Sequence, residues 1–258
     1  MTSVGIRRPD RRALLAWIGA LGSFSLAACS RNEATGRAQL VLVSDDMLRS
    51  MGEKSWAEAL AELPRNGDGA MNRRLTQVGE AVAKAAAVPG QDWEFVVFDS
   101  PQINAFVLPG GKVGVYRGLM EFVRSDAELA AVVAHEAGHV IARHAAERMS
   151  QQFAVEAGVR LAALAFGEEL GAYADEAAAA LGAGLVYGVI LPYSRAHELE
   201  ADRIGVDLMR QGGFEPAAAV NFWERMVARS GGEGEALAWL STHPAPAERL
   251  DALRRLAA

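Results

Sequence analysis

Two of the chain's five histidines belong to a His-Glu-Ala-Gly-His run at residues 135–139. Side chains four residues apart on an α-helix share a face, so the imidazoles of His135 and His139 can bind one metal ion together. Neutral imidazole nitrogens bind zinc at about 2.1 Å. Glu136 can take a proton from a water on that metal, because zinc lowers the pKa of bound water to about 7. The run therefore predicts a hydrolytic site with one Zn²⁺ per chain.

A zinc site of this kind needs a third protein ligand, and the acidic segment at residues 194–205 offers the best candidates. Glu198 and Asp202 are four residues apart, so one can ligate the metal while the other orients the site. Glu198 ranks first, with Glu200 and His197 behind it, because His197 lies about 100° from Glu198 around the helix. Glu200 should point elsewhere and pair with the arginine three residues later.

Other readings of the same residues remain open. The bare motif also occurs on helices whose histidines only form hydrogen bonds. His144, five residues after His139, should be turned away from the site and face solvent. The aromatic positions are expected in the core rather than against a cofactor. They are Trp56, Phe222, Trp223 and Trp239.

The metal-binding run should lie on one helix from residue 125 to about residue 149. Ser125 with Glu128 three residues later makes a capping box, a typical helix start. Three β-rich segments precede this helix, at residues 93–98, 105–108 and 113–116. Pro109-Gly110-Gly111 between the last two is typical of a hairpin. We therefore expect a small, mostly antiparallel sheet.

The rest of the chain has helical patterns. Helices are expected at residues 42–63 and 71–88, from Ser194 to Gly212, from Pro216 and from Pro246, with a long alanine-rich region at residues 151–191. The fold class is therefore α+β, mostly α-helical, and one domain is the simplest account.

The N-terminus has the composition of an export signal. Four arginines precede an apolar stretch that is short for a membrane span and ends in Leu-Ala-Ala before Cys29. A lone cysteine at this place is typical of lipidation in a bacterial lipoprotein, and a plain signal peptide with an incidental cysteine is the alternative. We expect a signal peptide at residues 1–28, a tether at 29–39 and a globular domain at 40–258. The net charge of −6 argues against a nucleic-acid partner and leaves the lipid anchor as the membrane contact.

Four segments together resemble the HtpX-type zinc metallopeptidases, the family that includes the CAAX prenyl-protein proteases, and within it the periplasmic BepA-like and LoiP-like branch. They are residues 104–111, 128–139, 194–205 and 240–244, in the order of the family. The resemblance implies a zincin-like fold whose third zinc ligand lies in a Glu-x-x-x-Asp motif. It selects Glu198 as that ligand and gives Asp202 a supporting or proton-donating role.

The resemblance also implies roles for two more residues. His243 stands in a Thr-His-Pro loop that approaches the metal in some relatives and can occlude it. By its chemistry His243 could be a reversible fourth ligand or stabilise an oxyanion, and the alternative is a loop histidine that contacts only backbone. Asn104 begins the segment that forms an edge strand to which an extended substrate adds, and the alternative is an asparagine of a strand-end turn.

The expected function is a zinc endopeptidase of the bacterial cell envelope, a periplasm-facing lipoprotein at the outer membrane that cleaves misfolded polypeptides. The chain lacks the long apolar spans of the membrane-embedded members, so prenyl-protein processing inside a bilayer is not expected. A chaperone-like protein that binds clients beside a latent zinc site is a second reading. A structural lipoprotein with an accidental motif is a third, and it predicts no stoichiometric zinc.

Overall fold

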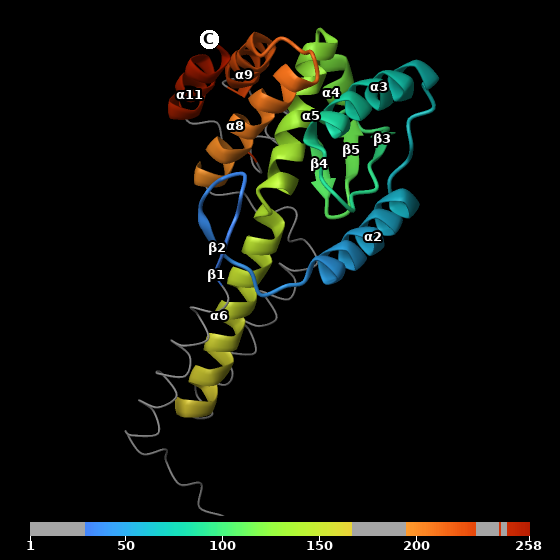
Figure 1. Ribbon diagram of the computed structural model, residues 1–258. Helices are drawn as coiled ribbons and strands as arrows, with labels where there is room; N and C mark the ends of the chain where they lie inside the picture. The colour runs from blue at the N-terminus through green and yellow to red at the C-terminus, as the bar shows by residue number, and fades with distance from the viewer. Residues whose placement is uncertain (1–28, 167–194, 231–242, 244–246) are drawn as a thin grey trace, which may run out of the picture. The chain divides into compact units, whose positions relative to one another are not determined.

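The computed structural model describes residues 29–166, 195–230, 243 and 247–258 (Figure 1). The expected signal peptide, the alanine-rich region beyond residue 166, Trp239 and most of the Thr-His-Pro loop lie outside these residues. By its internal contacts the chain divides into two compact units, where the sequence pointed to one domain from residue 40. The first is residues 1–43 with 146–188, and the second is residues 44–145 with 189–258.

The first unit contains an antiparallel hairpin where a tether was expected. Strand β1 (Cys29–Arg31) pairs with β2 (Ala38–Leu40), with Ser30 opposite Gln39. The turn is closed by the Asn32 side chain, whose oxygen accepts hydrogen bonds from the backbone N–H groups of residues 34 and 35. Arg37 and Gln39 both donate to the carboxylate of Glu147 on helix α6 (His144–Phe166).

The second unit is built around a three-stranded sheet of order β3-β5-β4. Strands β4 (Ala105–Leu108) and β5 (Lys112–Tyr116) form the expected hairpin, with Gly110 and Gly111 at positive φ. Strand β3 (Glu94–Phe98) pairs with β5 in parallel. The prediction of a mostly antiparallel sheet is therefore wrong, because the hairpin returns with β5 beside β3 in the same direction, and the sheet is mixed.

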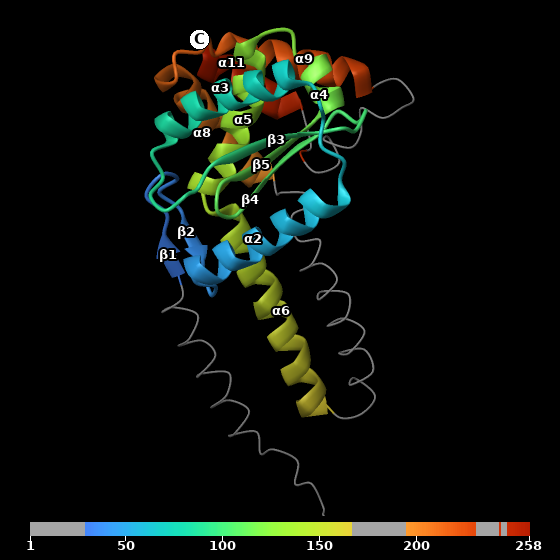
Figure 2. The same cartoon turned by 90° about the vertical axis from the view of Figure 1, so that its right-hand side faces the viewer.

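Helices cover both faces of this sheet (Figure 2). Alternate strand residues point to opposite faces. Val97, Val113 and Val115 pack against helix α3 (Gly69–Ala86) and helix α5 (Asp126–Ile141), in the main apolar core. Phe98 and Leu108 pack on the other face against Trp56 of helix α2 (Asp45–Glu62), which confirms the core position of Trp56.

Helix α5 (Asp126–Ile141) carries the metal-binding run and is the central helix of the second unit, following the short helix α4 (Arg117–Phe122). Ser125 caps it as predicted, accepting from the N–H of Glu128. The prediction of one helix to residue 149 is wrong. Arg143 adopts a left-handed conformation with φ of 56°, which ends α5, and α6 begins at His144.

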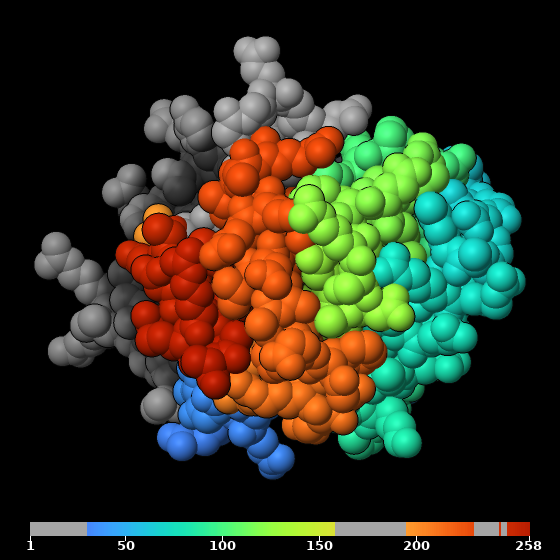
Figure 3. Space-filling model, turned by 90° about the horizontal axis from the view of Figure 1, so that it is seen from above, coloured from blue at the N-terminus to red at the C-terminus, as the bar shows by residue number. Residues whose placement is uncertain are grey.

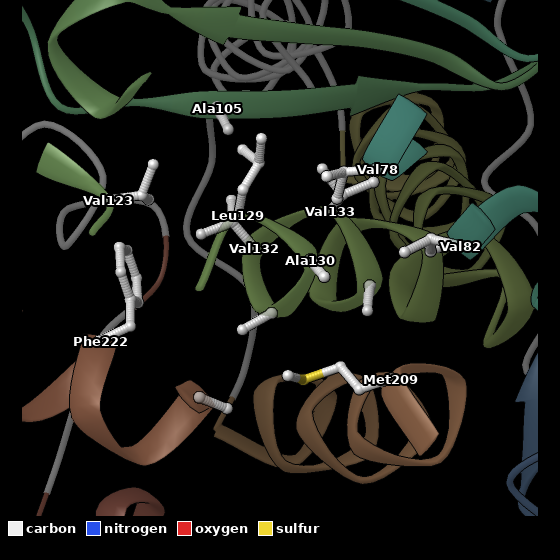
Figure 4. Packing of buried hydrophobic residues seen from close by; sticks show 14 of the residues in the cluster. Val78, Val82, Ala105, Val123, Leu129, Ala130, Val132, Val133, Met209 and Phe222 are labelled. Atoms are coloured by element: carbon white, nitrogen blue, oxygen red, sulfur yellow. The ribbon is translucent and has the colours of Figure 1, made fainter. Parts of the chain in front are cut away.

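Three C-terminal helices close the second unit around α5. They are α8 (Arg195–Gln211), α9 (Ala217–Ser230) and α11 (Ala247–Ala257). Figure 4 shows the apolar side chains of α5 between the strand that carries Ala105 and helix α8 with Met209, with Phe222 of α9 beside them. Figure 3 shows α11 and α9 side by side on one face of this unit. Among the described residues, no helix combines the length and apolar character needed to cross a bilayer.

Candidate metal centre

Helices α5 and α8 cross closely enough to bring their polar side chains together. Gly138 of α5 faces the backbone of Ala201, where an added Cβ would stand 2.7 Å from the carbonyl oxygen. Gly205 of α8 meets α5 in the same way, 3.1 Å from the backbone nitrogen of His135. A side chain at residue 138 would force the helices apart, and one at residue 205 would make a tight contact with the α5 backbone, so these glycines allow the close approach of the two helices.

The crossing brings His135, His139 and Glu198 together, and His243 from a later segment joins them in one buried cluster. One ligand atom of each of the four residues lies within 4.8 Å of the others. The Nε2 atoms of His135 and His139 are 3.1 Å apart. Glu198 oxygens lie 3.4 Å from Nε2 of His135 and 3.5 Å from Nε2 of His139. Nδ1 of His243 lies 3.3 Å from Nε2 of His135 and 3.2 Å from Glu198 Oε1.

These separations fit a zinc ion. Ligands at about 2.0–2.1 Å from a tetrahedral zinc are about 3.3 Å from one another. Two imidazoles and a carboxylate are also the donor set of catalytic zinc sites, and a third imidazole completes four-coordination. The cluster can therefore hold one Zn²⁺ without rearrangement of its helices.

The contacts of His135 present its Nε2 atom to a metal. Its Nδ1 lies 2.9 Å from Oδ1 of Asp202, so the ring donates there and its other nitrogen faces the cluster. Burial and the charge of Arg249 act to lower the pKa of His135, but hydrogen bonds to Asp202 and Glu198 outweigh them and raise it to about 9. A metal ion binding here has to displace that proton.

His139 is kept neutral, because burial and then the positive charge of His135 lower its pKa well below the ordinary value. Burial alone would raise the pKa of Glu198, but the charge of Arg249 and hydrogen bonds from His135 and His243 lower it far below the usual range. Glu198 is therefore an anion and His139 a neutral donor, the states that zinc ligation requires.

Glu136 and His243 lie next to each other at the centre. Glu136 is buried, and its Oε1 is 3.4 Å from Nε2 of His243. The geometry puts a carboxylate beside the cluster without making it one of the four donors. His243 contacts side chains, so the reading of it as a loop histidine that meets only backbone is wrong.

Arg249 of α11 is the residue that the sequence reasoning missed. It is 1% exposed, and its guanidinium donates to Glu198 at 2.6 Å, bonds both oxygens of Asp202 and lies 3.9 Å from the ring of Trp223. Its one sequence signal is that it shares a helix face with Leu253, which is also buried. Trp223 and Phe222 are buried, as predicted.

The prediction that His144 faces solvent is wrong. His144 is fully buried, and its Nδ1 lies 2.8 Å from Nδ1 of His139. The left-handed Arg143 explains this, because in a continuous helix His144 would be about 140° from His139. Glu200 bonds Nε2 of His144 at 2.9 Å, and its expected pairing with an arginine stays a prediction.

Asn104 stands just before the edge strand β4, and its side-chain oxygen accepts a hydrogen bond from the N–H of Ala105. Within the described residues, β4 pairs on one side only, with β5. The contacts of Asn104 suit a strand-end turn, while the position of the strand leaves substrate addition as a prediction.

Comparison with known proteins agrees with this geometry. The model of peptidase family M48 matches residues 70–257. The chain belongs to this family. M48 metallopeptidases are zinc-dependent, and the four-residue cluster could hold one metal ion.

The curated relatives come from two settings. The chain is 38% identical to the mitochondrial metalloendopeptidase OMA1 of Schizosaccharomyces pombe, over 81% of this chain and 60% of that protein. It is 32% identical to the metalloprotease LoiP of Escherichia coli, over 84% and 80%. It is 30% identical to the beta-barrel assembly-enhancing protease of Yersinia pestis, over 83% and 45%. The chain thus spans 60% or less of the first and third of these M48 relatives.

Proposed function

We propose that this chain is a zinc-dependent endopeptidase of the bacterial cell envelope that hydrolyses polypeptides. The observation that carries the proposal is the arrangement of His135, His139 and Glu198 at the mutual distances of zinc ligands, with Glu136 beside them. Zinc bound there would polarise a scissile carbonyl and acidify a water molecule. The relatives of this protein include a metalloprotease and a beta-barrel assembly-enhancing protease.

The chain's own residues have separate tasks in this reaction. Glu136 accepts the proton of the attacking water and then delivers it to the leaving amine, because a carboxylate can act first as base and then as acid. Asp202 and Arg249 keep His135 and Glu198 oriented. An extended substrate adds to the edge of β4 that is unpaired within the described part of the chain, with Asn104 at the start of the strand.

The envelope location rests on the N-terminal segment and on part of the comparisons. Residues 1–28 and Cys29 have the sequence of a lipoprotein signal, so we propose a lipid anchor at Cys29 and a periplasm-facing chain at the outer membrane with misfolded proteins as substrates. The mitochondrial relatives are metalloendopeptidases as well, so the proposed chemistry does not depend on this location.

Glu136→Gln tests the catalytic proposal. The change keeps the size of the side chain but removes its basicity, so the purified chain should retain one zinc and lose casein cleavage by at least about 100-fold. Zinc is measured by metal analysis and cleavage by release of labelled peptides. Substantial cleavage by Glu136→Gln would refute the role of Glu136, and absence of zinc from the unaltered chain would refute the proposed site.

A second function, client binding with a latent zinc site, is favoured by His243. Its Nδ1 lies within 3.3 Å of both Glu198 and His135, at the fourth corner of the cluster, where a catalytic site keeps an open position. If His243 only occludes the metal, His243→Ala should raise casein cleavage. If it stabilises the oxyanion, the same change should lower cleavage, and a latent site predicts no cleavage before the change.

A further inference from the structure

His139 is hydrogen-bonded to a series of polar residues that have no role in the proposed reaction. Its Nδ1 lies 2.8 Å from Nδ1 of His144, and Nε2 of His144 lies 2.9 Å from Oε2 of Glu200. The ring of His144 also stacks on that of His197, with 4.2 Å between their centroids. All four residues lie in the second unit, and the side chain of Glu200 is 18% exposed.

The proton positions in this series of hydrogen-bonded residues follow from which nitrogen of His139 faces the metal site. His139 presents Nε2 to the cluster, so a neutral His139 carries its proton on Nδ1 and donates it toward His144. Nδ1 of His144 must then accept, which puts the proton of His144 on Nε2. That proton points at Glu200, a carboxylate acceptor. In this arrangement each of these donors meets an acceptor.

We propose that His144 and Glu200 are positioning residues that fix the tautomer and ring orientation of the metal ligand His139. The inference rests on the proposed zinc site. His144 cannot itself join the same metal, since its Nδ1 faces the side of the His139 ring opposite to the metal-facing Nε2.

The two histidine ligands are thereby held differently. Nδ1 of His135 meets the carboxylate of Asp202 directly, and Arg249 is bonded to the same carboxylate. Nδ1 of His139 instead meets an imidazole, that of His144, which is bonded in turn to the carboxylate of Glu200. Partners of this kind hold metal-bound histidines in register, and their loss typically lowers metal affinity by about 10–100-fold.

The backbone at Arg143 makes the arrangement possible. A non-glycine residue in the left-handed region costs about 1 kcal/mol or more, so surrounding contacts must hold it there. The side chain of Arg143 forms an ion pair with Asp45 at the start of α2. This conformation turns His144 back toward His139, which a regular helix could not do.

Two substitutions at His144 separate its two contacts. The side-chain end of asparagine occupies nearly the position of the histidine Nδ1, whereas that of glutamine reaches the position of Nε2. His144→Asn should therefore keep an acceptor for His139 and bind zinc within about threefold of the unaltered chain, while His144→Gln should bind it about 10–100-fold more weakly. Affinity is measured on the full chain by competition with a zinc-binding chromophore.

A cobalt-substituted sample adds a readout of ligand geometry. At saturating Co²⁺, the visible absorption of His144→Gln should differ from that of the unaltered chain, and that of His144→Asn should not. Equal zinc affinities of all three chains would overturn the proposal, and so would equal losses in both variants, since His144 would then only fill space.

Glu200→Gln tests the last residue of the His139–His144–Glu200 series and does not alter the buried histidine. It leaves an acceptor without charge, so we expect a weakening of zinc binding smaller than that of His144→Gln. Leu199→Ala, at an exposed neighbour on the same helix, is the matched control and should bind zinc like the unaltered chain. If His144→Gln fails to fold, equal zinc affinity of Glu200→Gln and Leu199→Ala overturns the inference. An unaltered chain without zinc would instead refute the proposed function.

Discussion

Arg249 shows how a buried cation shapes the site at the scale of single residues. It lies among Glu198, Asp202 and His135, three groups whose charges depend on one another. Burial lowers the pKa of Arg249, but the charge of Asp202 and its hydrogen bond, followed by the charge of Glu198, outweigh this and raise it. In the metal-free chain Arg249 therefore compensates the buried carboxylates that a zinc ion would otherwise neutralise.

Arg249→Met should destabilise the metal-free chain more than the zinc-loaded one. Removal of one partner of a buried ion pair typically costs about 3–5 kcal/mol, because the other charge is left uncompensated. Zinc on Glu198 would supply part of that compensation. The free energy of unfolding is measured in urea with a chelator and with excess zinc. An equal loss under both conditions would contradict this account.

Arg254→Met is the control for this measurement. Arg254 lies on the same helix but is half exposed, and its ion pairs are with Asp251 and Glu224 at the surface. Exposed pairs contribute little to stability, so this change should have a small effect that does not depend on zinc.

The residue scale also separates what could be predicted from what could not. His135, Glu136 and His139 could be found because their spacing on one helix determines their relative geometry. Glu198 required a second segment, and its spacing from Asp202 indicated a shared face. Arg249 could not be found, because its role depends on where α11 packs, and the helix pattern predicts only that its face is buried.

At the scale of elements, the start of α5 is held by an ion pair to α9. The guanidinium of Arg225 bonds both oxygens of Glu128, and it lies over the ring of Phe122 at 4.9 Å. Glu128 also accepts a hydrogen bond from the backbone N–H of Arg124 at 2.6 Å. The capping residue predicted from sequence is thus also a link between two helices.

This link should make stability depend on pH. Burial acts to raise the pKa of Glu128, but hydrogen bonds from Arg225 and Arg124 outweigh burial and lower it below its ordinary value. A carboxylate whose pKa is lower in the folded state stabilises the fold above its unfolded-state pKa of about 4.3, and the contribution is lost as pH falls through the folded value. Glu128→Gln should cost about 2 kcal/mol at pH 7 and less below about pH 4.

Urea unfolding at several pH values checks this expectation. The difference in free energy of unfolding between the two chains should shrink as the pH is lowered from 7. A difference that stays constant over this range would show that packing of Glu128, rather than its charge, stabilises the helix start.

The elements also show why the fold was only partly predictable. The helix ends marked by Ser125 and by Gly212-Gly213 agree with the structure, since capping chemistry is local. The break at Arg143 was missed, because a left-handed arginine has no sequence signature and is held by an ion pair to a residue 98 positions away. The parallel pairing of β3 with β5 was missed too, because alternation does not determine the order of strands.

At the scale of the whole molecule, the site and the fold of the second unit are formed by the same contacts. Its donors come from α5, α8 and residue 243, and Arg249 comes from α11. The apolar core of this unit joins the same helices to the sheet. The packing of these helices therefore brings the donors together.

Removal of zinc should therefore lower stability without unfolding the chain. A ligand present at 100 times its dissociation constant stabilises a protein by about 2.7 kcal/mol, so a chelator should lower the midpoint of thermal unfolding and added zinc should restore it. The far-UV circular dichroism at 25 °C should keep its helical signal. Small zinc domains behave differently, because binding of the metal supplies most of their folding free energy.

Loss of the helical signal on chelation would mean that the metal holds α5, α8 and α11 together. The same chelator experiment in Arg249→Met distinguishes the two contributions that could hold the helices together without the metal, the apolar core and the charge of Arg249. If the core alone suffices, this variant should remain helical in the chelator. If Arg249 is the cation on which the empty site depends, its helical signal should be lost with the chelator and return with zinc, because one of the two positive charges must be present beside Glu198 and Asp202.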